Sequence, residues 1–171
     1  ASDPDAGQTL TYSITGGNTG GVFAINSATG ALTVAGALNY EAINSYVLTV
    51  QVTDSANPTL SASAAVTIAV LNVNELPTIS GGSLSLNENT AAGTVVTSLF
   101  PSDEDAGQTL TYAIISGNTG NAFAVNASGQ LVVFSSAALD YESHPIFTLD
   151  ITVTDNGTPN LSFTNRWFVN L

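Results

Sequence analysis

Acidic side chains are the residues of this sequence whose type and grouping could do chemistry. Thirteen Asp and Glu stand against one Arg and no Lys, which gives a net charge of −12. The chain has no Cys, no Met and a single His, so ligands for soft metal ions are almost absent, whereas carboxylate and amide oxygens are abundant. Such donors suit calcium, which accepts about six to eight oxygens, better than Mg²⁺, which keeps its waters and demands a tight octahedron.

These acidic residues are grouped rather than scattered. Eleven of the thirteen lie in repeated blocks or beside module boundaries, namely Asp3, Asp5, Glu41, Asp54, Glu75, Glu88, Asp103, Asp105, Asp140, Glu142 and Asp155. Carboxylates about 5 Å apart repel by roughly 3 kcal/mol per pair at an effective dielectric of about 20, and a hard divalent cation reverses the sign. The grouping therefore favours a cation site over its alternative, a solubilising acidic surface.

The composition also excludes several classes of function. Nucleic acid is not expected as a partner, because the cations that neutralise phosphates are missing. An EF-hand needs Gly at the sixth loop position and Glu at the twelfth, but counting from Asp103 these positions are Gln108 and Ile114. No stretch is long enough to span a membrane and no signal-peptide pattern is present, so we interpret the chain as a mature or excised fragment.

An internal repeat sets the domain organisation. The block at residues 3–12 recurs at 103–112, the block at 38–41 recurs at 139–142, and Val52-Thr53-Asp54 recurs as Val153-Thr154-Asp155. The segment Asn72-Val73-Asn74-Glu75-Leu76-Pro77 is the seam between the two copies, because Pro77 stops a strand ladder. We therefore predict two domains, 1–76 and 77–171, of which the first lacks its opening strand.

Each copy reads as a series of short strands. Apolar residues alternate with polar or small ones through 62–70, 110–114 and 147–153, and Gly and Asn clusters punctuate the strands. In the second copy, residues 83–87 and 94–99 supply opening strands that the first copy lacks. About seven strands in about 100 residues predict an all-β fold of two tandem Greek-key β-sandwich domains, Ig-like or cadherin-like in class, joined by a short linker.

The repeat also guards against over-interpreting single side chains. Trp167 has Val66 as its counterpart, on the strand face of other apolar residues, so we expect it in the core. Phe168 falls on the opposite face and is the better candidate for an exposed aromatic contact. His144 precedes Pro145 in a polar loop without a His in the other copy, and we expect it at the surface.

Strand order predicts which acidic blocks come together. Successive loops of a sandwich emerge alternately at its two ends, so the 38–41 loop and the exit of the last strand can share the far end of the first domain. The loop at 103–105 and the turn at Asp155 can likewise share the near end of the second domain. We expect both ends to face residues 72–75, which makes the seam a calcium site.

Four blocks, in order and twice, resemble cadherin repeats in their bacterial cadherin-like form. They are Asp-x-Asp-x-Gly before a Leu-x-Tyr-x-Ile strand, then Leu-Asp-Tyr-Glu, then Thr-Asp, then a linker close to Asp-x-Asn-Glu-x-Pro, and they cover nearly all of the chain. The resemblance implies extracellular or cell-surface localisation and calcium as the bound ion. Carried onto this sequence, it implies the metal ligands Glu41, Asn72, Asn74, Glu75, Asp103, Asp105 and Asp155, with Asn39 as a further candidate.

Departures from this family pattern reduce the expected charge at the seam. Asn39 and Asn72 stand where the family has Asp. We therefore expect fewer ions than the pattern allows, or weak ones, in the range of roughly 10⁻⁴ to 10⁻³ M that extracellular modules show. Two half-sites are also expected to be empty or weak, one formed by Glu88, Asp140 and Glu142, the other by Asp3, Asp5 and Asp54.

The sequence thus predicts a calcium-dependent adhesive and structural module of a large surface or secreted protein, in which calcium stiffens the joint between domains. Its expected partners are calcium ions and neighbouring repeats, with homotypic contacts and cell-surface polysaccharide left open. A polysaccharide-binding module of a secreted enzyme or adhesin is the alternative, suggested by Phe168 and the variable Gly and Asn loops. We do not expect an enzyme, since repeat geometry accounts for the acids and His144 has no repeated partner.

Overall fold

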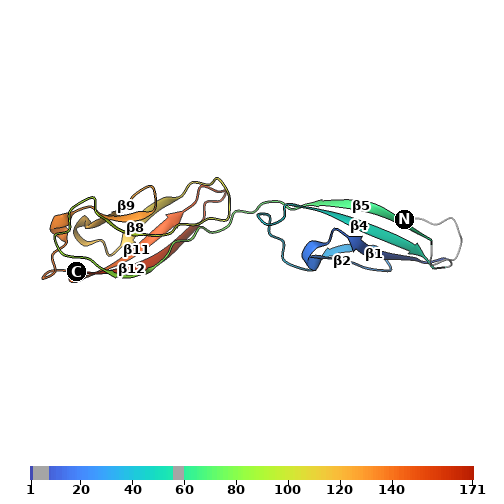
Figure 1. Ribbon diagram of the computed structural model, residues 1–171, viewed down its shortest axis with the longest axis horizontal. Coiled ribbons are helices and arrows are strands. Elements are labelled where there is room, and N and C mark those ends of the chain that lie inside the picture. Colours follow the sequence, from blue (N-terminus) through green and yellow to red (C-terminus); the bar gives the residue numbers. More distant parts are fainter. Residues whose placement is uncertain (2–7, 56–59) are drawn as a thin grey trace. The chain divides into compact units, whose positions relative to one another are not determined.

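A computed structural model of the chain describes residues 1, 8–55 and 60–171, and it divides into two compact units, Ala1–Val73 and Asn74–Leu171 (Figure 1). We call them unit 1 and unit 2. Asp3 and Asp5 lie outside the described residues. No helix in the described residues is long and apolar enough to cross a membrane.

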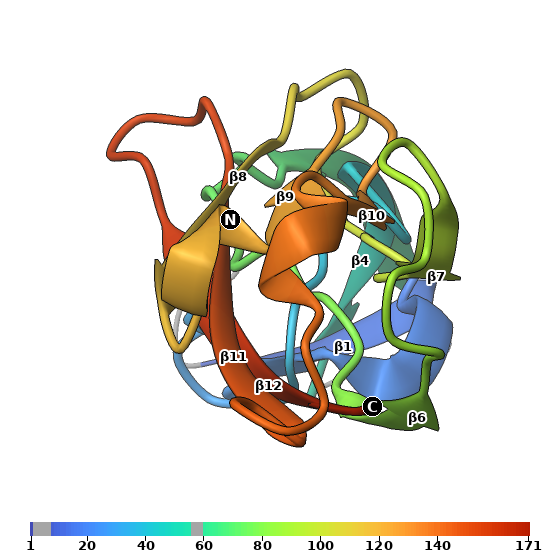
Figure 2. The ribbon, with the colours of Figure 1, turned by 90° about the vertical axis from the view of Figure 1, so that its left-hand side faces the viewer.

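Unit 2 is a sandwich of two sheets. Its strands are β6 (Gly82–Ser85), β7 (Val95–Ser98), β8 (Thr111–Ser116), β9 (Phe123–Val125), β10 (Gln130–Val133), β11 (Ile146–Thr154) and β12 (Ser162–Asn170). One sheet has the order β6-β12-β11-β8 and the other β7-β10-β9, with β6 parallel to β12. In Figure 2, β11 and β12 lie on one side of unit 2, and β7 and β10 lie on the other. The short 3-10 turns η2 (Thr119–Asn121) and η3 (Ser136–Ala138) lie in the connections.

Unit 1 repeats most of this arrangement. Its strands are β1 (Leu10–Gly16), β2 (Phe23–Ile25), β3 (Leu32–Val34), β4 (Ser45–Asp54) and β5 (Ser61–Ala69), with the turn η1 (Thr19–Gly21). The sheets have the orders β1-β4-β5 and β2-β3. The expected all-β class with two sandwich domains is therefore confirmed, and the strands lie where the alternating pattern placed them.

The internal repeat extends to individual hydrogen bonds. Asn18 Nδ2 donates to Phe23 O at 2.8 Å, and Phe23 N–H donates back to Asn18 Oδ1 at 3.1 Å. The same pair of bonds joins Asn118 and Phe123, at 2.8 and 2.9 Å. Each Asn thus closes the loop that leads into β2 or β9, because its amide satisfies both backbone groups of the first strand residue.

Alternation along the long strands builds the cores. In unit 2 the inward residues of β11, including Leu149, Ile151 and Val153, are fully buried, and they pack with Leu99, Leu131 and Val169. Among the described residues of unit 1 the buried core residues are Phe23, Tyr46 and Leu48, with the Phe23 and Tyr46 rings edge to face at 5.0 Å. Phe123 and Phe147 form the matching ring pair in unit 2, at 5.1 Å.

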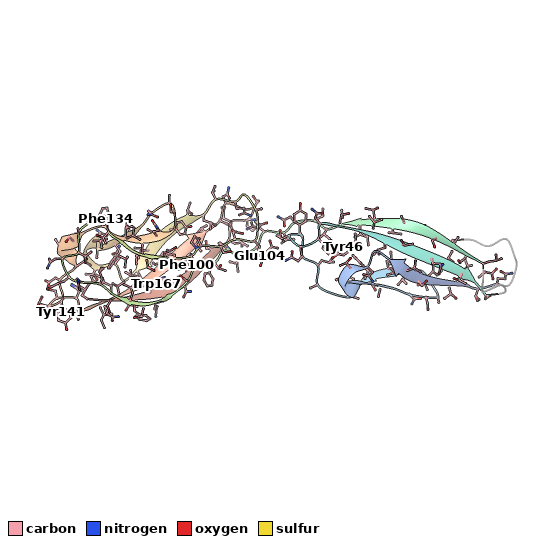
Figure 3. The ribbon with its side chains drawn as sticks, viewed as in Figure 1. Tyr46, Phe100, Glu104, Phe134, Tyr141 and Trp167 are labelled. Atoms are coloured by element: carbon pink, nitrogen blue, oxygen red, sulfur yellow. The ribbon has the colours of Figure 1, made fainter. Side chains whose placement is uncertain are left out.

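The three expectations for single side chains are confirmed. Trp167 is buried, 7% exposed, and its indole N–H donates to Ser80 O at 2.8 Å (Figure 3). Phe168 faces the other way and is 41% exposed. His144 lies at the surface, stacked on Phe147.

Candidate metal centre

The loop at residues 102–105 is fixed beside the start of unit 2 by two backbone hydrogen bonds. Thr78 N–H donates to Ser102 O at 2.7 Å, and Ser102 N–H donates to Thr78 O at 3.0 Å. Pro77 is fully buried just before this bridge, and β5 has already ended at Ala69. The bridge therefore holds the residues that precede Pro77 next to the acidic loop that follows β7.

Asp103, Asp105 and Glu75 meet at this bridge. Asp105 N–H donates to Asp103 Oδ1 at 3.0 Å, which folds the loop around the first carboxylate. Glu75 N–H donates to Asp105 Oδ2 at 3.0 Å, and carboxylate oxygens of Glu75 and Asp105 lie within 4.8 Å of each other. Asp105 is only 5% exposed. Two ionised carboxylates at this separation repel by about 3 kcal/mol at an effective dielectric of about 20.

Asp155 forms the other side of the same end of unit 2, directly after β11. Its Oδ1 accepts the N–H groups of Gly157 and Leu161, both at 2.9 Å, and its Oδ2 accepts Asn74 Nδ2 at 3.0 Å. Burial by itself would raise the pKa of Asp155, but these hydrogen bonds to the ionised form outweigh it, so the pKa lies below its ordinary value. Asp155 is therefore a buried, charged group.

Asn74 connects the two sides. Besides Asp155, its Nδ2 donates to Pro159 O at 2.9 Å, and its Oδ1 accepts the side-chain amide of Gln108. Thr109 N–H then donates to Asn156 Oδ1 at 2.8 Å, which links the loop after Asp105 to the turn after Asp155. The expected convergence of the 103–105 loop and the Asp155 turn on one end of unit 2 is thus observed.

Gln108 was not among the residues picked from the sequence. It belongs to the block repeated at residues 3–12 and 103–112, and its counterpart Gln8 also lies beside an acid, with its amide donating to the Asp54 carboxylate in the orientation that satisfies both groups. The recurrence of Gln after Asp-Ala-Gly in both copies was the available signal.

Buried oxygens without hydrogen-bond partners provide the test of whether these residues fit a cation. Asp103 Oδ2 and Gln108 Oε1 are both buried and accept no hydrogen bond from the described residues. A buried carboxylate oxygen without a donor is costly, and a cation satisfies it. Carboxylate and amide oxygens are the donors that calcium prefers, so the residue set fits calcium.

The candidate ligands from the other side of the seam belong to unit 1. Asn39 Oδ1 accepts Ala42 N–H at 2.7 Å and so shapes the turn that presents the exposed Glu41. Val70 N–H donates to Asn44 O at 3.0 Å, which brings the exit of β5 toward the same end of unit 1 as that turn. Asn72 follows and is exposed. That these three residues join the acids of unit 2 stays a prediction.

A second acidic group lies at the other end of unit 2. Ligand oxygens of Glu88, Asp140 and Glu142 lie within 4.8 Å of one another, and all three residues are exposed. Ser143 Oγ donates to Asp140 Oδ2 at 2.7 Å and Glu142 N–H to Oδ1 at 3.1 Å. The pKa of Asp140 is lowered, mainly by the hydrogen bond from the Ser143 side chain, and partial desolvation opposes this shift. The three acids expected as a half-site are thus close together.

Acidification is expected to remove the stability that the Asp155 carboxylate provides. Its folded pKa is below the unfolded value of about 3.9, so the contribution is present above about pH 4 and is lost as the pH falls through the folded pKa. In chelator near neutral pH, we expect D155N to have a lower free energy of unfolding than wild type. This difference should shrink on acidification. Carboxyl-carbon NMR titration gives the pKa directly, and a value at or above 3.9 for Asp155 would contradict this.

The Asn74 side chain is expected to leave room only for glycine at position 157. A Cβ at Gly157 would lie 1.8 Å from Asn74 Oδ1, and the backbone there is not left-handed, so the Asn74 side chain is the obstacle. Gly157→Ala should displace Asn74 from Asp155 and cost about 1 to 3 kcal/mol in urea unfolding. Because N74A removes the obstacle, the N74A/G157A double variant should lose less than the sum of the single variants. Strict additivity would show that the contact is not responsible.

Comparison with known proteins identifies relatives over almost the whole chain. A model of the cadherin domain family matches residues 1–71 and 83–171. The chain is 40% identical over 161 residues to cadherin EGF LAG seven-pass G-type receptor 3 of Rattus norvegicus, which covers 91% of this chain and 5% of the receptor. It is 38% identical over 172 residues to protocadherin Fat 4 of Homo sapiens, covering 96% of this chain and 3% of that protein. The chain therefore spans a small fraction of these relatives.

Solved structures give the same assignment. Mouse cadherin-23 EC22-24 superposes with a TM-score of 0.69 at 32% identity, covering 95% of this chain and 52% of that one. Human protocadherin-24 EC1-2 superposes with a TM-score of 0.74 at 25% identity, covering 95% and 81%. The bacterial form of the resemblance is not supported, because these relatives are mammalian. With its repeats, its sandwich topology and these matches, the chain belongs to the cadherin domain family and is an extracellular module of the kind found in adhesion proteins.

Proposed function

We propose that the chain is a calcium-dependent structural and adhesive module in which calcium binds at the seam between the two units. The observation that carries this proposal is the buried, unpartnered Oδ2 of Asp103 next to the close carboxylates of Glu75 and Asp105. An arrangement of buried acids with an unsatisfied oxygen is unfavourable by itself and favourable around a cation.

The proposed mechanism is a change of flexibility at the joint. When bound, calcium supplies positive charge to carboxylates that otherwise repel. Asp103, Asp105, Glu75 and Asp155 would hold the ion from unit 2, and Gln108 would orient Asn74 among them. Asn39, Glu41 and Asn72 would complete the shell from unit 1, and ligands drawn from both units would restrict the motion of one relative to the other.

The proposed binding is weak, because two ligand positions carry no charge. Asn39 and Asn72 are neutral where the family has Asp, so fewer ions or a lower affinity are expected, with dissociation constants of roughly 10⁻⁴ to 10⁻³ M. A chain of such repeats would stiffen as extracellular calcium rises and loosen when it falls.

A calcium titration tests this proposal. Calorimetry should show binding of at least one ion. The melting temperature should be higher in excess calcium than in chelator. At about 100 times the dissociation constant the expected gain in the free energy of unfolding is about 2.7 kcal/mol. Magnesium at the same concentration is the control and should give a smaller shift. If calcium neither binds nor raises the melting temperature, the acids form a solvated surface and the proposal is wrong.

We propose neighbouring repeats and homotypic contacts as the partners of the module. One solved relative, protocadherin gammaB7 EC3-6, is described as a cis-dimer and superposes with a TM-score of 0.68 at 26% identity, covering 40% of that chain.

The alternative polysaccharide-binding role rests on the exposed ring of Phe168. Retention on insoluble glycans that is lost in F168A would favour it. We propose no catalytic role, in keeping with relatives that are cadherins by name.

A further inference from the structure

The turn between β11 and β12 contains the one Asn-Gly dipeptide of the sequence, Asn156-Gly157. Asn156 is exposed, and so is Thr158, two residues further on. Glycine has no Cβ, so the backbone nitrogen of Gly157 is open to approach by the side chain that precedes it. An Asn amide next to such a nitrogen can close into a five-membered succinimide ring, because the chain itself holds the two reacting groups together.

The surroundings of the Asn156 amide suit this reaction. Its Oδ1 accepts Thr109 N–H at 2.8 Å, and this oxygen is the atom on which negative charge develops when the amide carbon is attacked. Among the described residues no hydrogen bond holds its Nδ2, the atom that must depart. Because the side chain is exposed, the departing ammonia passes directly to solvent.

The repeat shows that the fold does not require asparagine at position 156. The aligned repeat gives Ser55 as its counterpart in the first copy. Thr9 N–H donates to Ser55 Oγ at 3.0 Å in unit 1, just as Thr109 N–H donates to Asn156 Oδ1 in unit 2. A hydroxyl group therefore supports the same loop without offering an amide carbon that can be attacked.

Glycine at position 157, by contrast, is required by its neighbours. A Cβ there would lie 1.8 Å from Asn74 Oδ1, so a larger residue would displace the Asn74 side chain. The N–H of Gly157 donates to Asp155 Oδ1 at 2.9 Å. The reactive nitrogen is thus one of the groups that hold the Asp155 carboxylate in place.

We propose that Asn156 is a site of spontaneous deamidation, a modification that irreversibly loosens the end of unit 2 at Asp155. Gly157 N loses its proton to hydroxide and attacks Asn156 Cγ, so that a new C–N bond forms. The Cγ–Nδ2 bond then breaks, and Nδ2 takes a proton from water and leaves as ammonia. Water opens the resulting succinimide at either carbonyl, which leaves aspartate or isoaspartate at position 156. The net reaction consumes one water and needs no oxidant or cofactor.

The two products differ in their effect on Asp155. Aspartate keeps the length of the backbone and adds one negative charge to the turn. Isoaspartate carries the main chain through its side-chain carbon, so one more methylene lies between Asp155 and Gly157. This displaces the Gly157 N–H that now donates to Asp155 Oδ1. Loss of one hydrogen bond to a charged group should lower the melting temperature of a domain of this size by at least about 4 °C.

Ageing of the 171-residue chain in chelator tests the proposal. After incubation at mildly alkaline pH, peptide mapping by mass spectrometry should find the mass gain of an NH₂ group replaced by OH at Asn156. Conversion there should be at least about tenfold faster than at Asn89 or Asn121, which are also exposed but precede residues with a Cβ. Equal conversion at the three positions, or an intact Asn156, would overturn the proposal.

Asn156→Ser is the matched control, because Ser55 has the same hydrogen-bonding role in unit 1. The fresh variant should melt close to the fresh wild type, and ageing should lower the melting temperature of the wild type alone. Enzymatic methylation of isoaspartate measures the fraction of the loosened form. If wild type rich in isoaspartate melted at the temperature of the fresh chain, the proposed loosening would be wrong. Because chelator is present throughout, these outcomes are independent of the proposed calcium site.

Discussion

Replacing Asp103 and Asp105 together by Asn is expected to abolish the calcium-induced rise in melting temperature. Asn keeps the size of Asp and an oxygen that can accept the bonds from Asp105 N–H and Glu75 N–H. It removes two negative charges from a site whose affinity depends on ligand charge. The stabilisation of about 2.7 kcal/mol at saturating calcium should therefore disappear.

The same variant should behave in the opposite way in chelator. Without a cation, Glu75 and Asp105 carboxylates within 4.8 Å repel each other, and the substitution relieves this repulsion. The upper limit of the gain is about 3 kcal/mol, from Coulomb's law at an effective dielectric of about 20. A variant that is at least as stable as wild type in chelator and unresponsive to calcium would separate loss of binding from loss of folding.

Two control variants complete the experiment. Glu104→Gln removes an exposed charge from the same loop, and Asp140→Asn removes one from the other acidic end of unit 2. Both should retain most of the calcium response. If the double Asn variant kept the full response, or if Glu104→Gln lost as much, the assignment of Asp103 and Asp105 as ligands would be wrong.

The fold could be predicted because its determinants repeat locally. Alternation along 147–153 follows from strands that bury one face, and Leu149, Ile151 and Val153 are buried as that pattern requires. The end of unit 2 at which Asp103, Asp105 and Asp155 meet also follows, because strand order decides where each loop emerges. These features depend on periodicity and connectivity, which a sequence contains directly.

Side-chain networks could not be predicted in the same way. The bonds that join Gln108, Asn74 and Asp155 depend on rotamers and on the close approach of Asn74 to Gly157, and neither leaves a periodic trace. The pairing of Arg166 with Asp150 is another example: Nε donates to Oδ1 at 2.6 Å and lowers the pKa of Asp150. It became evident only when the register placed Asp150 opposite Arg166 on adjacent strands.

Alanine at Gly117 is expected to unfold unit 2 under conditions in which unit 1 stays folded, and alanine at Gly17 is expected to do the reverse. Both glycines have φ of 76°, and a Cβ would lie 1.7 Å from Thr148 O at Gly117 and 1.8 Å from Val47 O at Gly17. The obstacle is backbone of the central strand, so it cannot move aside as a side chain could.

The expected cost of either substitution is at least about 3 kcal/mol, since left-handed backbone costs a non-glycine residue about 1 to 3 kcal/mol before the clash is added. Domains of this size are stable by only about 5 to 15 kcal/mol. Gly93→Ala and Gly21→Ala are matched controls, because both positions have positive φ but nothing within 4 Å of the added Cβ. These two controls should lower the free energy of unfolding by less, and the difference is the contribution of the clash.

Calorimetry in chelator should resolve two unfolding transitions, and each of the two variants, at Gly117 and at Gly17, should lower the melting temperature of one of them. A single transition that both variants lower equally would show that the units unfold together.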